Sequence, residues 1–119
     1  MGHHDGRGAV IGNEYSGWLV MTLKDLKEGV IILKLHTRSY NTPKLPDGFA
    51  FDYAIDGVVT TLTKDQFMDK KKQIDRVVET LTILDDPNFT SESKDVEIAI
   101  RLRDSGRSIV FGVSHVYWA

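Results

Sequence analysis

Hydrophobic and polar residues alternate with a period of two along most of this chain. Residues 49–56 and 96–103 place large apolar side chains at every second position, with small or charged residues between them. This is the repeat of a β-strand, and it indicates that one face packs on a core while the other meets water. The segments 77–84 and 109–118 follow the same pattern. The pattern therefore predicts a mainly β fold.

Two further segments, 18–23 and 30–37, are apolar on both faces for part of their length. Strands of this kind are typical of the middle of a sheet. We expect the core to be built from the inward positions of all these strands: Leu19, Met21, Leu23, Ile31, Leu33, Leu35, Phe49, Phe51, Tyr53, Ile55, Val77, Leu81, Ile83, Val96, Ile98, Ile100, Leu102, Ile109, Phe111 and Val113.

Turn-forming residues separate the predicted strands. The links 27–29 and 104–107 predict hairpins, with Gly29 supplying a positive φ, and the Asp-Gly pair 56–57 predicts a tight turn. Residues 41–48 contain two prolines and predict an irregular loop.

One segment departs from the β pattern. Thr63 and Gln66 fit a capping box, and apolar residues then recur at helical spacing, which predicts a short helix over 64–73. The lysines at 70–72 are expected on its solvated face.

Strands joined mostly by hairpins, with a single helix, describe an all-β fold: an antiparallel two-layer β-sandwich, jelly-roll or immunoglobulin-like. An open barrel is the alternative. Residues 14–119 are expected to form one domain, and the polar, Gly-rich residues 1–13 a flexible N-terminal segment. His3, His4 and Asp5 would make only a weak metal site there.

Composition excludes several classes of function. The 119 residues contain no cysteine, which excludes disulfides, thiolate zinc sites and cysteine nucleophiles. The net charge is −2, so a nucleic-acid partner is not expected. No apolar segment reaches the ~18 residues of a membrane helix, so no membrane insertion is expected.

Three oxygen-bearing side chains, Asp85, Asp86 and Asn88, follow a predicted strand and suit Ca²⁺. The alternative is an Asx-type turn before Pro87, since one short loop supplies too few ligands for calcium. We expect the turn, and no cofactor. Residues 88–90 also form an N-glycosylation sequon, which favours a secreted or cell-surface location.

No catalytic motif is present, so no catalytic residue is predicted. Alternation places His115 on one face with Phe111, Val113 and Tyr117, where a buried histidine is expected. Ser114 would then point to the opposite face, which argues against a Ser–His pair.

Aromatic residues near strand or chain ends suggest a ligand surface. Sugar rings stack on such side chains, so Trp18, Tyr40, Tyr117 and Trp118 are the candidate ligand-binding residues. Trp18 and Trp118 could instead cover the core or a sheet edge.

The stretches 16–23, 51–57, 84–89 and 115–119 are similar to an uncharacterised domain at the C-terminal end of certain microalgal proteins. The resemblance spans residues 16–119 and implies that this chain is the C-terminal module of a larger protein. It transfers no activity and no catalytic residue. Similar domains carry cysteines near the Ser105-Gly106 turn, and this chain has none.

These observations favour a non-catalytic binding module with a carbohydrate or protein ligand. The alternative is a structural or self-assembly domain of a larger protein, in which strands 18–23 and 30–35 pair with another copy or with the rest of the parent protein. An enzyme ranks third, because no acid–base pair stands out.

Overall fold

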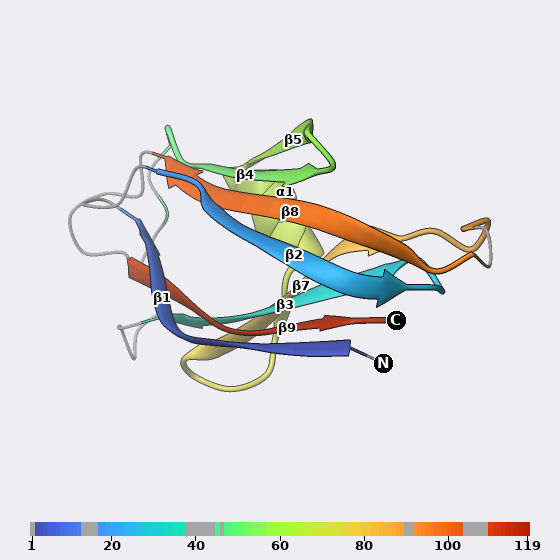
Figure 1. Cartoon of the computed structure of the whole chain (residues 1–119). Helices are drawn as coiled ribbons and strands as arrows, with labels where there is room; N and C mark the ends of the chain where they lie inside the picture. The colour runs from blue at the N-terminus through green and yellow to red at the C-terminus, as the bar shows by residue number, and fades with distance from the viewer. Residues whose placement is uncertain (1, 13–16, 38–44, 46, 90–91, 104–109) are drawn as a thin grey trace.

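In the computed structural model, the chain folds into two antiparallel β-sheets packed face to face (Figure 1). The structure describes residues 2–12, 17–37, 45, 47–89, 92–103 and 110–119. The predicted two-layer antiparallel sandwich with a single short helix is thereby confirmed. The elements are β1 (Gly2–Gly12), β2 (Leu19–Leu26), β3 (Val30–Thr37), β4 (Ala50–Ile55), β5 (Val58–Thr63), α1 (Lys64–Lys70), β6 (Lys72–Gln73), β7 (Val78–Asp85), β8 (Lys94–Arg103) and β9 (Val110–Trp118).

The order of strands is β1-β9-β3-β7-β6 in one sheet, here sheet A, and β2-β8-β4-β5 in the other, sheet B. Consecutive strands therefore often lie in different sheets. The link 27–29 connects β2 of sheet B to β3 of sheet A, and β8 and β9 are likewise in different sheets. The hairpin predicted at 27–29 is therefore wrong, because a turn that joins two sheets is formed by the same types of residue as a hairpin. Residues 104–107 lie outside the described residues, but the strands on either side of them, β8 and β9, do not pair with each other. Gly29 does have a positive φ, 74°.

The tight turn predicted at Asp56 and Gly57 is confirmed, and it joins β4 and β5 as a hairpin. These residues have φ values of 49° and 82°, and Ile55 pairs with Val58 across them. Positive φ at both central positions is the geometry of a type I′ turn, whose twist matches that of the two strands.

The two apolar strands differ in position. β3 lies between β9 and β7, so both of its edges are hydrogen-bonded within the chain. The pairing of residues 30–35 with another copy is therefore excluded. β2 lies at the edge of sheet B rather than in its middle, and Val20 on its outer face is 52% exposed.

Helix α1 begins at the predicted capping box. The Thr63 side chain accepts from the Gln66 amide, and the Gln66 side chain accepts from the Thr63 amide. The helix ends at Lys70, three residues before the predicted end, because residues 72–73 pair with β7 as strand β6. Its buried residue Phe67 packs on the rings of Phe49 and Phe51.

The expected flexible N-terminal segment differs from the observed structure. Residues 2–12 form β1, which pairs antiparallel with β9 along most of its length. Figure 1 shows the N- and C-termini close to each other at one end of the sandwich.

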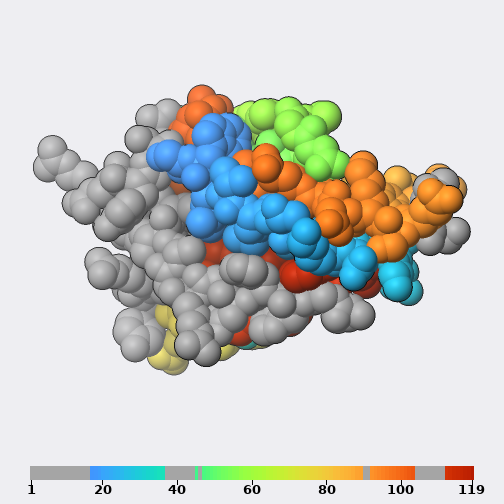
Figure 2. All heavy atoms as spheres, in the orientation of Figure 1, coloured from blue at the N-terminus to red at the C-terminus, as the bar shows by residue number. Residues whose placement is uncertain are grey.

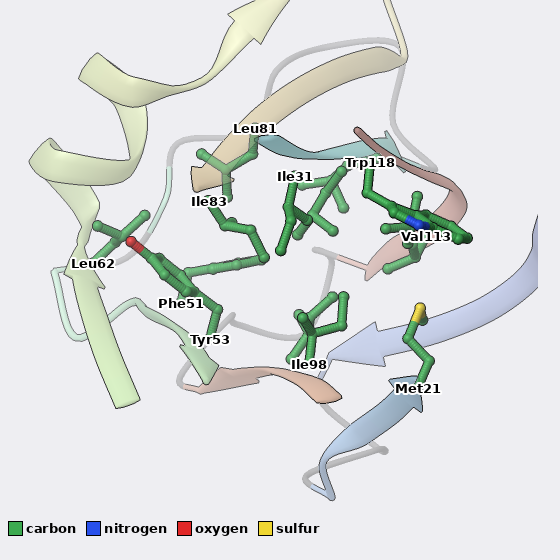
Figure 3. Packing of buried hydrophobic residues seen from close by; sticks show 14 of the residues in the cluster. Met21, Ile31, Phe51, Tyr53, Leu62, Leu81, Ile83, Ile98, Val113 and Trp118 are labelled. Atoms are coloured by element: carbon green, nitrogen blue, oxygen red, sulfur yellow. The ribbon is translucent and has the colours of Figure 1, made fainter. Parts of the chain in front are cut away.

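The core lies between the two sheets, and side chains from both sheets point into it (Figure 3). Most of the predicted core is buried. Leu19, Ile55 and Val77 are half-buried, whereas Ile109 and the Phe111 side chain lie outside the described part. The buried hydrophobic residues that the pattern missed are Leu26, Ala54, Leu62, Phe67, Val78, Val116 and Trp118. Among the described residues, no helix is long and apolar enough to cross a membrane.

Candidate functional site

A buried carboxylate lies on the outer face of sheet B. Asp52 of β4 was expected to meet water, but its exposure is 0%. In register it pairs with Arg101 of β8 on one side and Thr61 of β5 on the other. Side chains opposite one another in neighbouring strands share a face of the sheet, so these residues cover Asp52. The solvent-facing assignment of Asp52 was wrong because alternation separates the two faces of a strand but does not show which residues of neighbouring strands cover each face.

Two arginines and a threonine hold this carboxylate. Oδ2 of Asp52 accepts from Nε of Arg101 and from Nε of Arg103, each at 2.7 Å. Oδ1 accepts from Oγ1 of Thr61 at 2.6 Å and from Nη2 of Arg103 at 3.2 Å. Charge-assisted bonds of this kind fix the donor side chains in place.

Burial alone would raise the pKa of Asp52, since it disfavours the charged form. The hydrogen bonds from Arg103, Thr61 and Arg101 outweigh that effect, and the pKa falls from 3.8 to about 2. Asp52 is therefore ionised at neutral pH. A carboxylate in this state positions the arginines and does not act as a general acid.

Trp18 lies beside the arginines. The Arg101 guanidinium carbon is 4.3 Å from the centre of the Trp18 ring, within the range of a cation–π contact. The indole is 36% exposed, so it meets both Arg101 and solvent. Trp18, Asp52, Thr61, Arg101 and Arg103 are referred to here as the outer-face cluster.

An apolar row borders the outer-face cluster. It runs across all four strands of sheet B in register, with small residues in the middle and valines at both ends: Val20, Ala99, Ala54 and Val59. The two valines are 52% and 53% exposed. Figure 2 shows β2 and β8 side by side at the surface, with the β4–β5 hairpin beyond them. The outer face of sheet B thus combines an aromatic ring, fixed cations and apolar surface.

The predicted ligand-binding residues do not form a single site, because those that the structure describes lie in different parts of the fold. Trp18 is in the outer-face cluster. Tyr117 is half-buried in sheet A, with its ring stacked on His115. Trp118 is 8% exposed, packs in the core and donates from Nε1 to the Lys24 carbonyl at 2.6 Å. Tyr40 lies outside the described residues.

The predicted calcium loop has the geometry of a turn. Oδ1 of Asp86 accepts from the backbone amide of Asn88 at 3.0 Å, which is the contact that defines an Asx turn. The carbonyl of Asp86 accepts from the amide of Phe89. Asp85 and Asn88 are exposed. Across the described ranges, no three His, Cys, Asp or Glu side chains are grouped in a way that could hold a metal ion.

A β-bulge changes the predicted arrangement around His115. Val113 pairs with Leu35 and His115 pairs with Lys34, so β9 has one extra residue, Ser114, at this point. Val113 is buried, whereas His115 is only half-buried. The predictions that His115 shares a face with Val113 and that it is buried are therefore wrong. Oγ of Ser114 lies 3.2 Å from Nδ1 of His115, although strict alternation would separate them.

A second buried charge lies between α1 and sheet A. Glu79 of β7 is 3% exposed, and its Oε1 is 3.0 Å from Nζ of Lys71. Nζ of Lys71 also donates to Oε1 of Gln73, while Oε2 of Glu79 has no partner among the described residues. The Lys71 side chain is only 8% exposed, so the expectation of a solvated face for all three lysines is wrong.

The sequence contained a signal for the outer-face cluster. Charges at 52, 101 and 103 occupy the outward positions of two apolar strands, and opposite charges on neighbouring strands attract. The missing information was that β4 and β8 are neighbours, since 49 residues separate Asp52 from Arg101. No alternation pattern determines which strands pair.

The chain was compared with protein-family models, with curated proteins and with solved structures, and none of the three comparisons found a match. The resemblance to the microalgal domain therefore stays a prediction.

Proposed function

We propose that this domain is a non-catalytic binding module for a carbohydrate that carries acidic groups, and that the outer-face cluster is its binding site. The observation that carries the proposal is the buried Asp52, which holds Arg101 and Arg103 beside an exposed tryptophan. An aromatic ring next to fixed guanidinium groups suits a saccharide with carboxylate or sulfate substituents.

Each part of the cluster has a distinct role in this proposal. Arg101 is bound to Asp52 through Nε, and its Nη atoms have no partner among the described residues. Those atoms are donors for a carboxylate or sulfate, which a guanidinium contacts at two points. One face of the Trp18 ring meets Arg101, and the exposed part of the indole is where the C–H groups of a sugar ring would stack.

Preorganisation supports the proposal energetically. A free arginine loses side-chain entropy when a ligand immobilises it. Asp52 already holds both arginines at 2.7 Å, so part of that loss has occurred on folding. The net charge of −2 also argues against general attraction of anions, and selectivity would have to come from this local arrangement.

The test is titration calorimetry and tryptophan fluorescence with three polymers: a polyuronate, a sulfated galactan and a neutral β-glucan. Binding to an acidic polymer is expected to shift the fluorescence, because Trp18 is exposed whereas Trp118 is buried. Trp18→Ala and Arg101→Gln are each expected to weaken binding about tenfold or more, the loss of one charge-assisted or stacking contact.

Arg76→Gln is the matched control, since it removes the same charge from an exposed position outside the cluster. This variant should bind as the wild type does. Equal losses in Arg76→Gln and Arg101→Gln would indicate unspecific attraction and would refute the proposed site. Absence of binding to all three polymers would refute the carbohydrate ligand and leave a protein as the remaining class of partner.

A further inference from the structure

The outer face of strand β8 changes the sign of its charge along its length. Buried and outward residues alternate in this strand, and the outward positions are Asp95, Glu97, Ala99, Arg101 and Arg103. Acidic residues thus occupy one end of this face and basic residues the other, with a single alanine between them. Because β8 lies between β2 and β4, the change of sign falls in the middle of sheet B.

Glu97 differs from the other acidic residues near it. Asp95 binds Lys24 at 3.0 Å, and Asp56 binds Lys94 at 3.0 Å. The backbone amide of Glu97 donates to Oδ1 of Asp56, also at 3.0 Å. Its side chain is exposed, and its carboxylate has no partner among the described residues. Glu97 is therefore an open anionic acceptor on the same face as the outer-face cluster.

Ala99 lies midway between Glu97 and the outer-face cluster. It is two residues from Glu97 and two from Arg101, so at about 3.3 Å per residue each is about 7 Å away along β8. Ala99 pairs with Ala54, and the two form the small centre of the apolar row. A sugar ring on these alanines would have guanidinium donors on one side and a carboxylate on the other.

We propose that the ligand of the outer-face cluster is zwitterionic: a saccharide in which an acidic group binds Arg101 and a free amino group on the adjacent sugar residue binds Glu97. This inference rests on the proposed function and narrows its substrate class. Arg101 and Glu97 are four residues apart, about 13 Å along the strand, and their long side chains shorten the gap between the charged groups. Groups on two adjacent sugar residues can therefore reach both.

Electrostatics favours an amino group at Glu97 over the alternatives. A protonated amine donates a charge-assisted hydrogen bond to a carboxylate, about twice as strong as the bond from a neutral hydroxyl. A second acidic group at this position would meet the negative charge of Glu97, and like charges brought together at an interface exclude the wrong partner. Glu97 is therefore a specificity-determining residue, which weakens the binding of polymers whose sugar residues are all acidic.

Two polymers that differ only at the amino group test this selectivity. The first is an alternating copolymer of glucuronate and N-acetylglucosamine, and the second is the same copolymer after N-deacetylation. Titration calorimetry is carried out at about pH 6, where the free amino group is protonated. The wild type should bind the deacetylated copolymer about tenfold more tightly, which is the gain expected from one charge-assisted hydrogen bond.

Glu97→Gln keeps the size of the side chain and removes its charge. This variant should bind both copolymers with nearly equal affinity, because an amide oxygen attracts a cation less than a carboxylate does. Glu28→Gln is the matched control, since it removes the same charge from an exposed residue in the link between β2 and β3, outside the outer face of sheet B. It should keep the wild-type preference. Thermal unfolding checks that both variants are folded.

Equal affinity of the wild type for the two copolymers would overturn the zwitterionic ligand, and so would a preference that persists in Glu97→Gln. The same loss of preference in Glu28→Gln would indicate attraction by overall charge and would also overturn it. These results leave the proposed function intact if Trp18→Ala still weakens binding. Binding of the polyuronate without either copolymer would likewise refute this inference alone, whereas failure of every acidic polymer to bind would refute both.

Discussion

Arg103 contacts Asp52 at two points, with Nε 2.7 Å from Oδ2 and Nη2 3.2 Å from Oδ1. Side-by-side contacts of this kind are the geometry in which a guanidinium binds a carboxylate most strongly. Because Asp52 is completely buried, this pair contributes to both stability and the shape of the outer face of sheet B.

The pKa of Asp52 predicts how stability depends on pH. The pKa is 3.8 in the absence of the fold and about 2 in the folded protein, so the ionised form stabilises the fold. This contribution is fully present above about pH 4 and is lost as the pH falls toward 2. In urea unfolding, Asp52→Asn should reduce the stability difference between pH 5 and pH 2 by about 2 kcal/mol.

Asp69→Asn, an exposed carboxylate on α1, is the control for the amide substitution and should keep the wild-type pH dependence. If Asp52→Asn also kept it, the carboxylate would not be the group that titrates.

The two glycines with positive φ are expected to differ in their tolerance of alanine. A Cβ at Gly57 meets nothing within 4 Å, so Gly57→Ala should cost only about 1 kcal/mol for its left-handed backbone. A Cβ at Gly29 would lie 2.5 Å from Cβ of Phe89 and 3.0 Å from the Asp86 carbonyl. Gly29→Ala should therefore cost about 1–3 kcal/mol more. Thermal unfolding of the two variants compares them directly, and equal melting temperatures would contradict the packing argument.

Removing one partner of the Lys71–Glu79 pair should lower the free energy of unfolding much more than replacing both partners with apolar residues. Lys71→Met leaves a buried carboxylate without its partner, which should destabilise the fold by about 3–5 kcal/mol. The double variant Lys71→Met/Glu79→Leu removes both charges and should recover most of that loss. Denaturant unfolding of the wild type, the single variants Lys71→Met and Glu79→Leu, and the double variant gives the coupling energy between the two side chains. Additive losses would show that the pair does not interact.

Ile98 tests the face assignment of β8. It is 0% exposed, so Ile98→Ala should cost about 2–5 kcal/mol through lost burial and a cavity. Val20→Ala, on the exposed outer face of β2, should change stability by less than about 0.5 kcal/mol. Chemical denaturation measures both changes. A reversed order would place the two side chains on the wrong faces.

The loop with Asp85 and Asp86 is expected to behave as a turn. Wild-type melting temperature should not respond to calcium, because only a ligand of the folded state raises it. Replacing both aspartates with alanine should cost about 1 kcal/mol, equally with and without calcium, since Asp86 binds the Asn88 amide. A calcium-dependent rise in the wild type that vanishes in the double variant would establish an ion site instead.

Local signals in the sequence were sufficient for most of the strands, for the turn at 56–57 and for the start of the helix, whereas β1 and β6 were not predicted. Alternation at 49–56 and 96–103 predicted β4 and β8, because the side chains of a strand must alternate whatever it pairs with. The Asp-Gly pair at 56–57 and the capping box of α1 were equally predictable. Both are satisfied by hydrogen bonds and dihedral angles within a few residues.

Only the tertiary structure decided which strands are neighbours, and the functional surface depends on that. Alternation alone predicts that Asp52 faces solvent, whereas the pairing of β4 with β8 places Arg101 and Arg103 beside it. The bulge at Ser114 is likewise defined only by the pairing of β9 with β3, which the local sequence does not specify. Alternation records the two faces of each strand, but contacts between strands far apart in the chain depend on how the whole core packs. The sequence by itself therefore determined the fold class, and the packing of the sheets determined what each outer face presents.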